Sequence, residues 1–189
     1  MVSFKNIFVI YGPSGSGQDS VIEGVQKLIA VERVITTVTR PMRQAESQGH
    51  PYYFISRDQF EKKIEQKELL EYLQKFDGVY YGVTTEEVER VAKSGKIGIW
   101  KVDFAGARDL KTRFPELTVI CINAPLAQIE ERIRRRDNPT EEYIQTRLAH
   151  IREWLPKSIY DYQIENQDGK LDEAIAQATA LIKKHHATS

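Results

Sequence analysis

Residues 12–20 read GPSGSGQDS, and this glycine-rich stretch decides the fold of the 189-residue chain. Before it, the apolar run Ile7–Tyr11 stops at Gly12, as a buried strand would. After it, apolar residues recur at helical spacing over 21–29, which predicts a helix from about Asp19. Such a turn directs backbone N–H groups and the positive end of a helix to one point, so it predicts a phosphate-binding loop. A similar turn that binds nothing is the weaker alternative, because three glycines and two serines fall in the first six residues.

The loop departs from the Walker A pattern, which is glycine, four residues, glycine, lysine and then serine or threonine. Both glycines are in place, but Gln18 stands at the lysine position and Asp19 at that of the magnesium-binding hydroxyl. A neutral amide can hydrogen-bond a phosphate oxygen but cannot offset its charge, so the loss is expected to cost on the order of several kcal/mol in the transition state. Asp19 can bind Mg²⁺ directly, and Ser20 offers a hydroxyl one position later.

Strand and helix patterns alternate along most of the chain, which predicts an α/β fold with a parallel sheet covered by helices on both faces. Buried strands are expected at 97–102 and 118–122, with another strand at 162–165. The segment 35–84 carries hairpin signals and predicts a small β-rich subdomain on this core. The other expected elements are strands at 33–38 and 52–55, a hairpin of 69–76 with 79–81, and helices over 58–66, 85–93, 105–113, 126–136, 140–154 and 171–184.

The composition is that of an ordinary globular domain and limits its partners. Net charge is zero, with 27 basic and 27 acidic side chains, so no nucleic acid or membrane partner is expected. One cysteine, Cys121, excludes an internal disulfide and fits a reducing compartment. The N-terminal apolar run is too short for a signal peptide or a membrane span, so a cytoplasmic monomer or homodimer is expected.

A second stretch, TTVTRPMRQAE at residues 36–46, resembles the GMP-binding segment of guanylate kinases. Arg40 and Arg43, and Tyr52 beyond them, match that family residue for residue, and Thr36 keeps the hydroxyl of a family serine. By the resemblance these residues would hold the phosphate of GMP. Paired arginines with hydroxyl donors suit a phosphate dianion.

The resemblance continues downstream and covers nearly the whole chain. Leu70-Glu71 matches the pair whose carboxylate reads the guanine edge, and Tyr80-Tyr81-Gly82 matches the motif that closes on the phosphate. Val83 stands where the family has serine or threonine, with Thr84 beside it, which puts one hydrogen bond to the base in doubt. The GMP-binding residues that the resemblance implies are Thr36, Arg40, Arg43, Glu46, Tyr52, Glu71, Tyr81, Gly82, Thr84 and Asp103.

The resemblance also implies a reaction, in which a phosphoryl group passes from ATP to GMP or dGMP with Mg²⁺ as cofactor. It implies a three-layer P-loop fold with a core of 1–34, 85–125 and 148–189, a GMP-binding insert at 35–84 and a helical lid at 126–147. Arg132, Arg136 and Arg147 match, in spacing, arginines of the lid and the following helix, and would act on the transferring group. The implied ATP-binding residues are Gly12, Ser14, Gly15, Ser16, Gly17, Gln18, Asp19 and Ser20, of which the last two would also hold the metal.

A reciprocal change marks Lys101, at the end of the strand expected over 97–102. The family usually carries an acidic residue there, whereas this chain has lost a lysine at position 18 and gained one at position 101. Because the end of that strand should lie beside the phosphate loop, we hypothesise that Lys101 replaces the missing cation. Unrelated drift in a protein that no longer phosphorylates anything is an alternative of similar weight.

Two other functions remain open at this point. Ribose 1,5-bisphosphate kinases resemble guanylate kinases and carry aspartate-serine after the loop lysine, like Asp19-Ser20, and a valine like Val83. They tend to lack the set of Arg40, Arg43, Glu46 and Tyr52. Guanylate kinase-like domains of scaffold proteins have degraded loops and bind phosphorylated ligands without turnover, but the lid sequence here favours a small-molecule protein.

Overall fold

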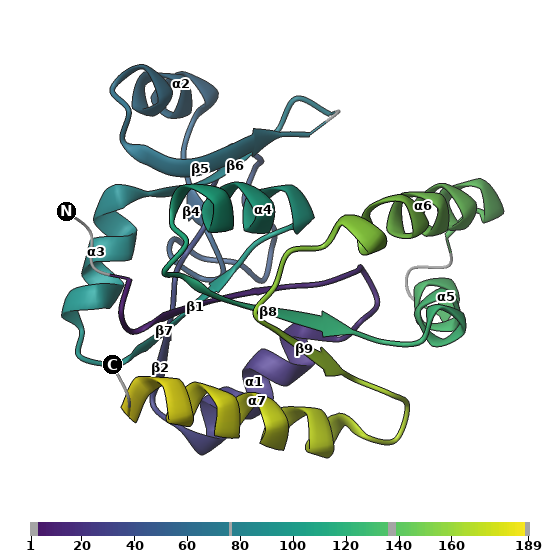
Figure 1. Cartoon of the computed structure of the whole chain (residues 1–189). Coiled ribbons are helices and arrows are strands. Elements are labelled where there is room, and N and C mark those ends of the chain that lie inside the picture. The colour runs from purple at the N-terminus through teal and green to yellow at the C-terminus, as the bar shows by residue number, and fades with distance from the viewer. Residues whose placement is uncertain (1–3, 76, 136–138, 188–189) are drawn as a thin grey trace.

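The computed structural model describes residues 4–75, 77–135 and 139–187 (Figure 1). Its centre is a five-stranded sheet in the order β2-β7-β1-β8-β9, in which every neighbouring pair is parallel. This confirms the central parallel sheet expected from the sequence. The strands are β1 (Ile7–Tyr11), β2 (Val31–Arg33), β7 (Ile97–Lys101), β8 (Thr118–Asn123) and β9 (Tyr162–Glu165).

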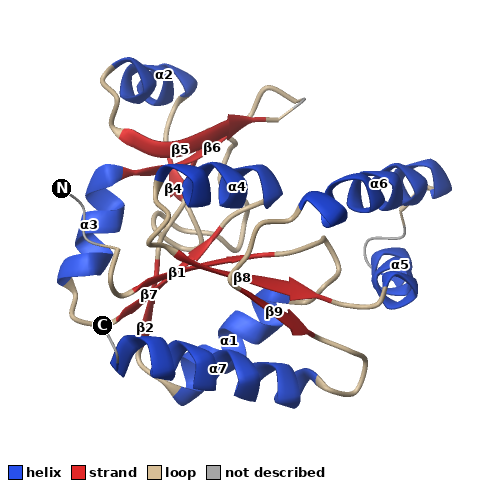
Figure 2. Ribbon diagram, in the orientation of Figure 1, coloured by secondary structure: helices blue, strands red, loops and turns tan. Residues whose placement is uncertain are grey.

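Helices cover both faces of this sheet (Figure 2). They are α1 (Gln18–Leu28) and α7 (Leu171–Ala187) on one face, and α3 (Thr85–Lys93) and α4 (Phe104–Arg113) on the other. Ile7, Val9 and Tyr11 belong to the apolar cluster under α3 and α4, whereas Phe8 and Ile10 belong to the cluster under α1 and α7. A strand buried on both faces reads as an unbroken apolar run, which is why β1 was recognisable.

A second, four-stranded sheet lies against the first assembly, in the order β4-β3-β6-β5. Its strands are β3 (Thr37–Val38), β4 (Tyr53–Phe54), β5 (Leu69–Gln74) and β6 (Tyr80–Thr84). The expected hairpin is confirmed, because β5 and β6 pair antiparallel with Leu73 opposite Tyr81. Helix α2 (Arg57–Glu65) begins at Ser56, whose side chain and that of Gln59 form a capping box.

The single strand expected over residues 33–38 is wrong. β2 ends at Arg33 in the central sheet, and β3 begins at Thr37 in the second sheet. Between them the Ile35 N–H donates to Glu87 Oε1 of α3 at 2.8 Å, a side-chain contact that replaces a ladder bond. The apolar, β-branched run therefore contains the crossing between two sheets, which period alone does not reveal.

Helices α5 (Leu126–Arg135) and α6 (Glu141–Trp154), followed by the short 3-10 helix η1 (Leu155–Lys157), lie beyond the carboxyl ends of β8 and β9 (Figure 1). In a parallel sheet all carboxyl ends lie at one edge, where ligands bind in this class of fold. That edge carries the loop after β1, the end of β7 and the start of α5. Across the described ranges, no helix is long and apolar enough to cross a membrane.

Candidate functional site

In the loop after β1, Gly12 and Gly17 lie so close to neighbouring atoms that a larger residue would clash. A Cβ on Gly12 would lie 2.0 Å from the carbonyl oxygen of Ile122 in β8, and one on Gly17 would lie 2.3 Å from Nδ2 of Asn166. Gly15 and Gly17 also have φ values of +87° and +83°, in the left-handed region that favours glycine. The glycines therefore serve the shape of the loop, as the sequence predicted.

Three side chains bind the carbonyl groups of this loop from outside. Gln18 Nε2 donates to Gly12 O at 2.5 Å, Arg132 Nη1 donates to Gly15 O at 3.1 Å, and Asn166 Nδ2 donates to Ser16 O at 2.8 Å. With these carbonyls bound by side chains, the loop suits an anion held by backbone N–H groups.

Two further observations fit an anion at the loop. Helix α1 begins at Gly17 without a side-chain cap, so the N–H groups of its first turn remain for a ligand. The hydroxyl of Ser16 is buried and has no hydrogen-bond partner within the described part of the chain. Phosphate oxygens would satisfy both groups, so the residues present fit the phosphates of a nucleotide.

Gln18 does not occupy the loop as a phosphate ligand would. Besides its bond to Gly12, its Nε2 lies 3.4 Å from the carbonyl of Pro13, so its amide nitrogen is committed to the backbone. Its Oε1 is buried without a partner among the residues that the structure covers. Gln18 therefore keeps the loop in shape but supplies no charge.

Asp19, in the first turn of α1, is paired with two cations. Lys101 Nζ lies 2.6 Å from its Oδ2, and Arg33 Nη2 lies 3.4 Å from its Oδ1. Burial raises the pKa of Asp19, but the hydrogen bond and charge of Lys101, with a smaller effect of Arg33, outweigh it, and the pKa is lowered. Asp19 is thus ionised at neutral pH. The structure brings Lys101 to the start of α1, as the reciprocal change suggested.

On the second sheet, Arg40 is held by a carboxylate. Its Nη1 and Nη2 donate to the two oxygens of Glu46 at 2.6 and 2.5 Å, and Glu46 also accepts the Arg43 N–H at 2.9 Å. The guanidinium lies over the ring of Tyr52, 5.2 Å from its centroid. Glu46 thus positions Arg40, whereas the side chain of Arg43 is exposed.

Tyr52 stands edge-on to Tyr81, with ring centroids 6.2 Å apart. Burial, with a contribution from Tyr81, raises the pKa of Tyr52, so its phenol stays protonated and can donate. Lys75 Nζ lies 4.1 Å above the Tyr81 ring, which adds a cation that the sequence did not indicate. Arg40, Tyr52 and Tyr81 form one cluster of donors for an anion.

Glu71 on β5 is a half-buried acid next to other acids. Burial raises its pKa to about 8, and the charges of Asp103 and Asp109 add to the effect. Asp103 caps α4 by accepting the Gly106 N–H at 2.8 Å, and a Cβ on Gly106 would lie 3.6 Å from Glu71 Oε2. A ligand with N–H donors would relieve the cost of a carboxylate here.

Three predicted GMP ligands, Thr84, Gly82 and Thr36, also make contacts within the protein. Thr84 Oγ1 accepts the Glu87 N–H at 3.1 Å and caps α3. Gly82 is enclosed, because a Cβ there would lie 2.8 Å from the Glu71 carbonyl and 3.0 Å from Phe60 Cζ. Thr36 contributes its carbonyl to the Tyr53 N–H at 3.0 Å. Their role in binding GMP stays a prediction.

Of the three predicted arginines, Arg132 reaches the loop. Besides Gly15 it binds the carbonyl of Asn166 at 2.9 Å and Asp168 Oδ1 at 2.6 Å. Arg147 instead stacks over Tyr143 of its own helix, 5.1 Å from the ring centroid. Arg136 lies outside the described residues.

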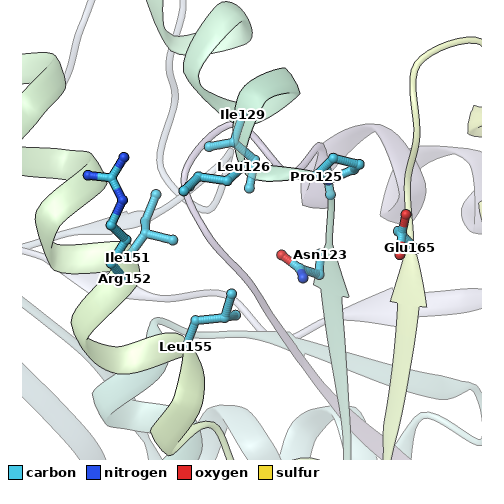
Figure 3. A pocket seen from close by; sticks show the side chains of 9 residues that line it. Asn123, Pro125, Leu126, Ile129, Ile151, Arg152, Leu155 and Glu165 are labelled. Carbon is cyan, nitrogen blue, oxygen red and sulfur yellow. The ribbon is translucent and has the colours of Figure 1, made fainter.

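A cavity of about 190 Å³ opens between α5, α6 and the ends of β8 and β9 (Figure 3). Leu126, Ile129 and Ile151 form its apolar wall, and Asn123 points into it from β8. The buried Oδ1 of Asn123 lacks a partner among the residues described. Ile129 of α5 lines this cavity and also lies close to Gly15 of the loop after β1, so α5 separates the cavity from that loop.

Sequence reasoning missed Asn166, Asp168 and Arg33. Asn166 directly follows β9, Asp168 lies two positions further on, and Arg33 ends β2. The rule that functional residues gather at the carboxyl ends of parallel strands could have indicated all three. No local pattern around them does so.

Comparisons with known proteins agree with this geometry. The family model described as guanylate kinase matches residues 4–185. The chain is 37% identical over 165 residues to a guanylate kinase of Nostoc sp., covering 86% of this chain and 82% of that protein. It is 34% identical over 184 residues to a guanylate kinase of Fusobacterium nucleatum, covering 96% and 98%. A crystal structure of guanylate kinase from Anaplasma phagocytophilum shares the fold, with a TM-score of 0.65, 21% identity and coverage of 95% and 85%.

Proposed function

Because this chain belongs to the guanylate kinase family, we propose that it is a nucleoside monophosphate kinase that transfers the terminal phosphoryl group of ATP to GMP, giving ADP and GDP. The observation that carries the proposal is the combination of two acceptor features in one chain. One is the arginine clamp at Arg40, and the other is the half-buried carboxyl of Glu71, whose pKa is raised. The first suits a phosphate and the second suits the N–H edge of guanine.

The acceptor phosphate would be held by Arg40 with Tyr52 and Tyr81, and by Arg43 once its exposed side chain turns inward. A nucleoside monophosphate is largely a dianion at neutral pH, since its second pKa is about 6. Its oxygen can therefore attack without a general base. Catalysis is then a matter of positioning and of neutralising charge.

The donor phosphates would lie in the loop, against the backbone N–H groups after Gly12 and the uncapped start of α1. Asp19 and the exposed Ser20 are the oxygen ligands available for Mg²⁺, which would neutralise phosphate charge. Among the described residues, no three acidic, histidine or cysteine side chains are placed to hold a metal ion together, so phosphate and water would complete the coordination. Arg132 binds the carbonyl of Gly15 in the loop, and it would have to turn from that carbonyl to stabilise the transferring group. Arg136 and Arg147 would join it when the 126–147 segment closes as a lid.

The two alternative functions are less well supported. A sugar bisphosphate has no base to satisfy Glu71, whose burial is costly without one. A binding module that ignores ATP has no need of a loop whose carbonyls are held by Gln18, Arg132 and Asn166.

The unpaired Cys121 supports the expectation of a reducing, cytoplasmic compartment.

A coupled assay that detects ADP tests the proposal. We expect turnover with ATP, Mg²⁺ and GMP, and none when ribose 1,5-bisphosphate replaces GMP. Turnover with the sugar bisphosphate alone would favour that kinase instead. Binding of GMP without binding of ATP, measured by calorimetry, would favour the phospholigand-binding function.

A further inference from the structure

We infer that Lys101 supplies the donor-site cation in this chain and that Asp19 controls it. In the absence of nucleotide, Asp19 holds Lys101. When Asp19 is engaged by Mg²⁺, Lys101 passes to the phosphates of the donor. This inference rests on the proposed function, because it assigns the charge that the donor loop lacks.

Position 18 cannot supply that charge. Gln18 is neutral, and its amide nitrogen binds the carbonyl of Gly12 at 2.5 Å. Turning it toward a phosphate would leave this loop carbonyl without its donor. The cation must therefore come from another element that reaches the loop.

Lys101 meets that requirement by its place in the sheet. It ends β7, which pairs with β1 so that Lys101 lies opposite Ile10, two residues before Gly12. Its ammonium lies 2.6 Å from a carboxylate oxygen of Asp19, in the first turn of the helix that leaves the loop. A side chain at this carboxyl end of the sheet points to the edge where the phosphates would lie.

The pair is also free to exchange partners. The side chains of Lys101 and Asp19 are 35% and 57% exposed, and ion pairs as exposed as this contribute little to stability. Lysine is a mobile point charge on a flexible stem, so a short movement does not require the backbone to shift. Arg33, at 3.4 Å, is a second and longer contact that can remain.

The exchange predicts opposite effects for its two members, which separates it from a simple surface ion pair. In nucleotide binding without Mg²⁺, Asp19 competes with the phosphates for Lys101 and repels them. Asp19→Asn should therefore tighten binding of metal-free ATP, by about tenfold. Lys101→Met should weaken it by about tenfold or more, and should leave GMP affinity unchanged.

Calorimetric titration with ATP, with and without Mg²⁺, measures these affinities directly. Lys96→Met is the matched control, because Lys96 also forms an ion pair, with Glu32 at 3.0 Å, but lies at the opposite end of β7. This variant should bind ATP as tightly as the wild type. The double variant Asp19→Asn with Lys101→Met should bind metal-free ATP more weakly than Asp19→Asn alone. Circular dichroism of each variant checks that it is folded.

The inference is overturned if Lys101→Met binds ATP as tightly as the wild type, or if Asp19→Asn weakens binding of metal-free ATP. The double variant Gln18→Lys with Lys101→Met tests whether the loss in Lys101→Met is due to the missing charge rather than to a disturbed structure. It should restore the turnover that Lys101→Met loses. These binding results stand apart from the proposed function. If the wild type binds ATP and responds to these substitutions but never phosphorylates GMP, only the proposed function fails.

Discussion

The guanidinium of Arg40 and the carboxylate of Glu46 form a two-pronged pair, with both nitrogen-to-oxygen distances at or below 2.6 Å. Their side chains are only 12% and 13% exposed, so the pair is shielded from water. Both terminal nitrogens of Arg40 donate to Glu46, and the guanidinium lies over the rings of Tyr52 and Phe54. Glu46 thereby positions Arg40, the arginine of the proposed acceptor clamp.

Replacing Glu46 by glutamine should raise the KM for GMP and change kcat little. The amide keeps the shape but loses the charge that orients Arg40, and charge-assisted hydrogen bonds are roughly twice as strong as neutral ones, so the KM should rise about tenfold. Steady-state kinetics with GMP as the varied substrate measures this. Glu89→Gln, which removes a carboxylate paired with Lys93 on the surface of α3, is the control. Equal KM values for both variants would contradict the role of Glu46.

GMP affinity should rise with pH through the neutral range. With a pKa of about 8, Glu71 is largely protonated at pH 7, whereas guanine presents N–H donors that need the carboxylate. The association constant should climb about tenfold per pH unit below pH 8 and level off above it. Calorimetry between pH 6.5 and 9 would show this, with proton release at the lower values. Glu71→Gln should give a flat profile, and a flat profile in the wild type would refute the assignment.

The same group should make the nucleotide-free protein less stable in base. The folded pKa of Glu71, about 8, lies above its ordinary 4.5, so its contribution to stability is complete below pH 4.5 and is lost as the pH rises through 8. Glu71→Gln does not titrate, so its free energy of unfolding should exceed that of the wild type by an amount that grows over this window. We expect a difference on the order of a few kcal/mol. Urea unfolding at pH 5, 7 and 9 measures it, and a constant difference would count against the burial of the charge.

Gly17→Ala should abolish donor binding and lower stability. The new Cβ would lie 2.3 Å from Asn166 Nδ2 and would also strain a φ of +83°. Gly95→Ala is the matched control, since Gly95 has a φ of +72° but nothing within 4 Å of its Cβ. Strain alone costs about 1 kcal/mol, so Gly95→Ala should lose that much in thermal unfolding and keep its affinity for ATP. If both variants bind ATP equally, the contact with Asn166 does not shape the loop.

Much of the fold could be predicted because the signals for it are local. The apolar run of β1 predicts a buried strand, and the glycines that follow it within a few residues predict a phosphate loop. Ser56 and Thr140 cap helix starts, each by accepting the N–H of the residue three positions later. The break between β2 and β3 could not be predicted, because it depends on Glu87, which lies 52 residues from its partner Ile35.

The site was harder to predict than the fold because side-chain directions depend on distant partners. Asn166 holds the Ser16 carbonyl across 150 positions of sequence, and no pattern links them. Thr84 and Glu46 carry hydroxyl and carboxylate groups that also bind within the protein, at the start of α3 and at Arg40, and these contacts cannot be read from the sequence. The position of Lys101 was predictable, since parallel pairing fixes which strand ends meet.

The register that sets Ile10 opposite Lys101 has a consequence for how such proteins diverge. Lys101 contacts Asp19, the neighbour of Gln18, across 82 positions of sequence, so a positive charge could move from the start of α1 to the end of β7 through an ancestor that carries both. If Lys101 supplies the donor-site cation as inferred above, each step of that path keeps a cation near the phosphates. A search for the Walker A motif that requires lysine at its usual position would miss such proteins. A search of structures for a positive charge beside the phosphate loop would find them.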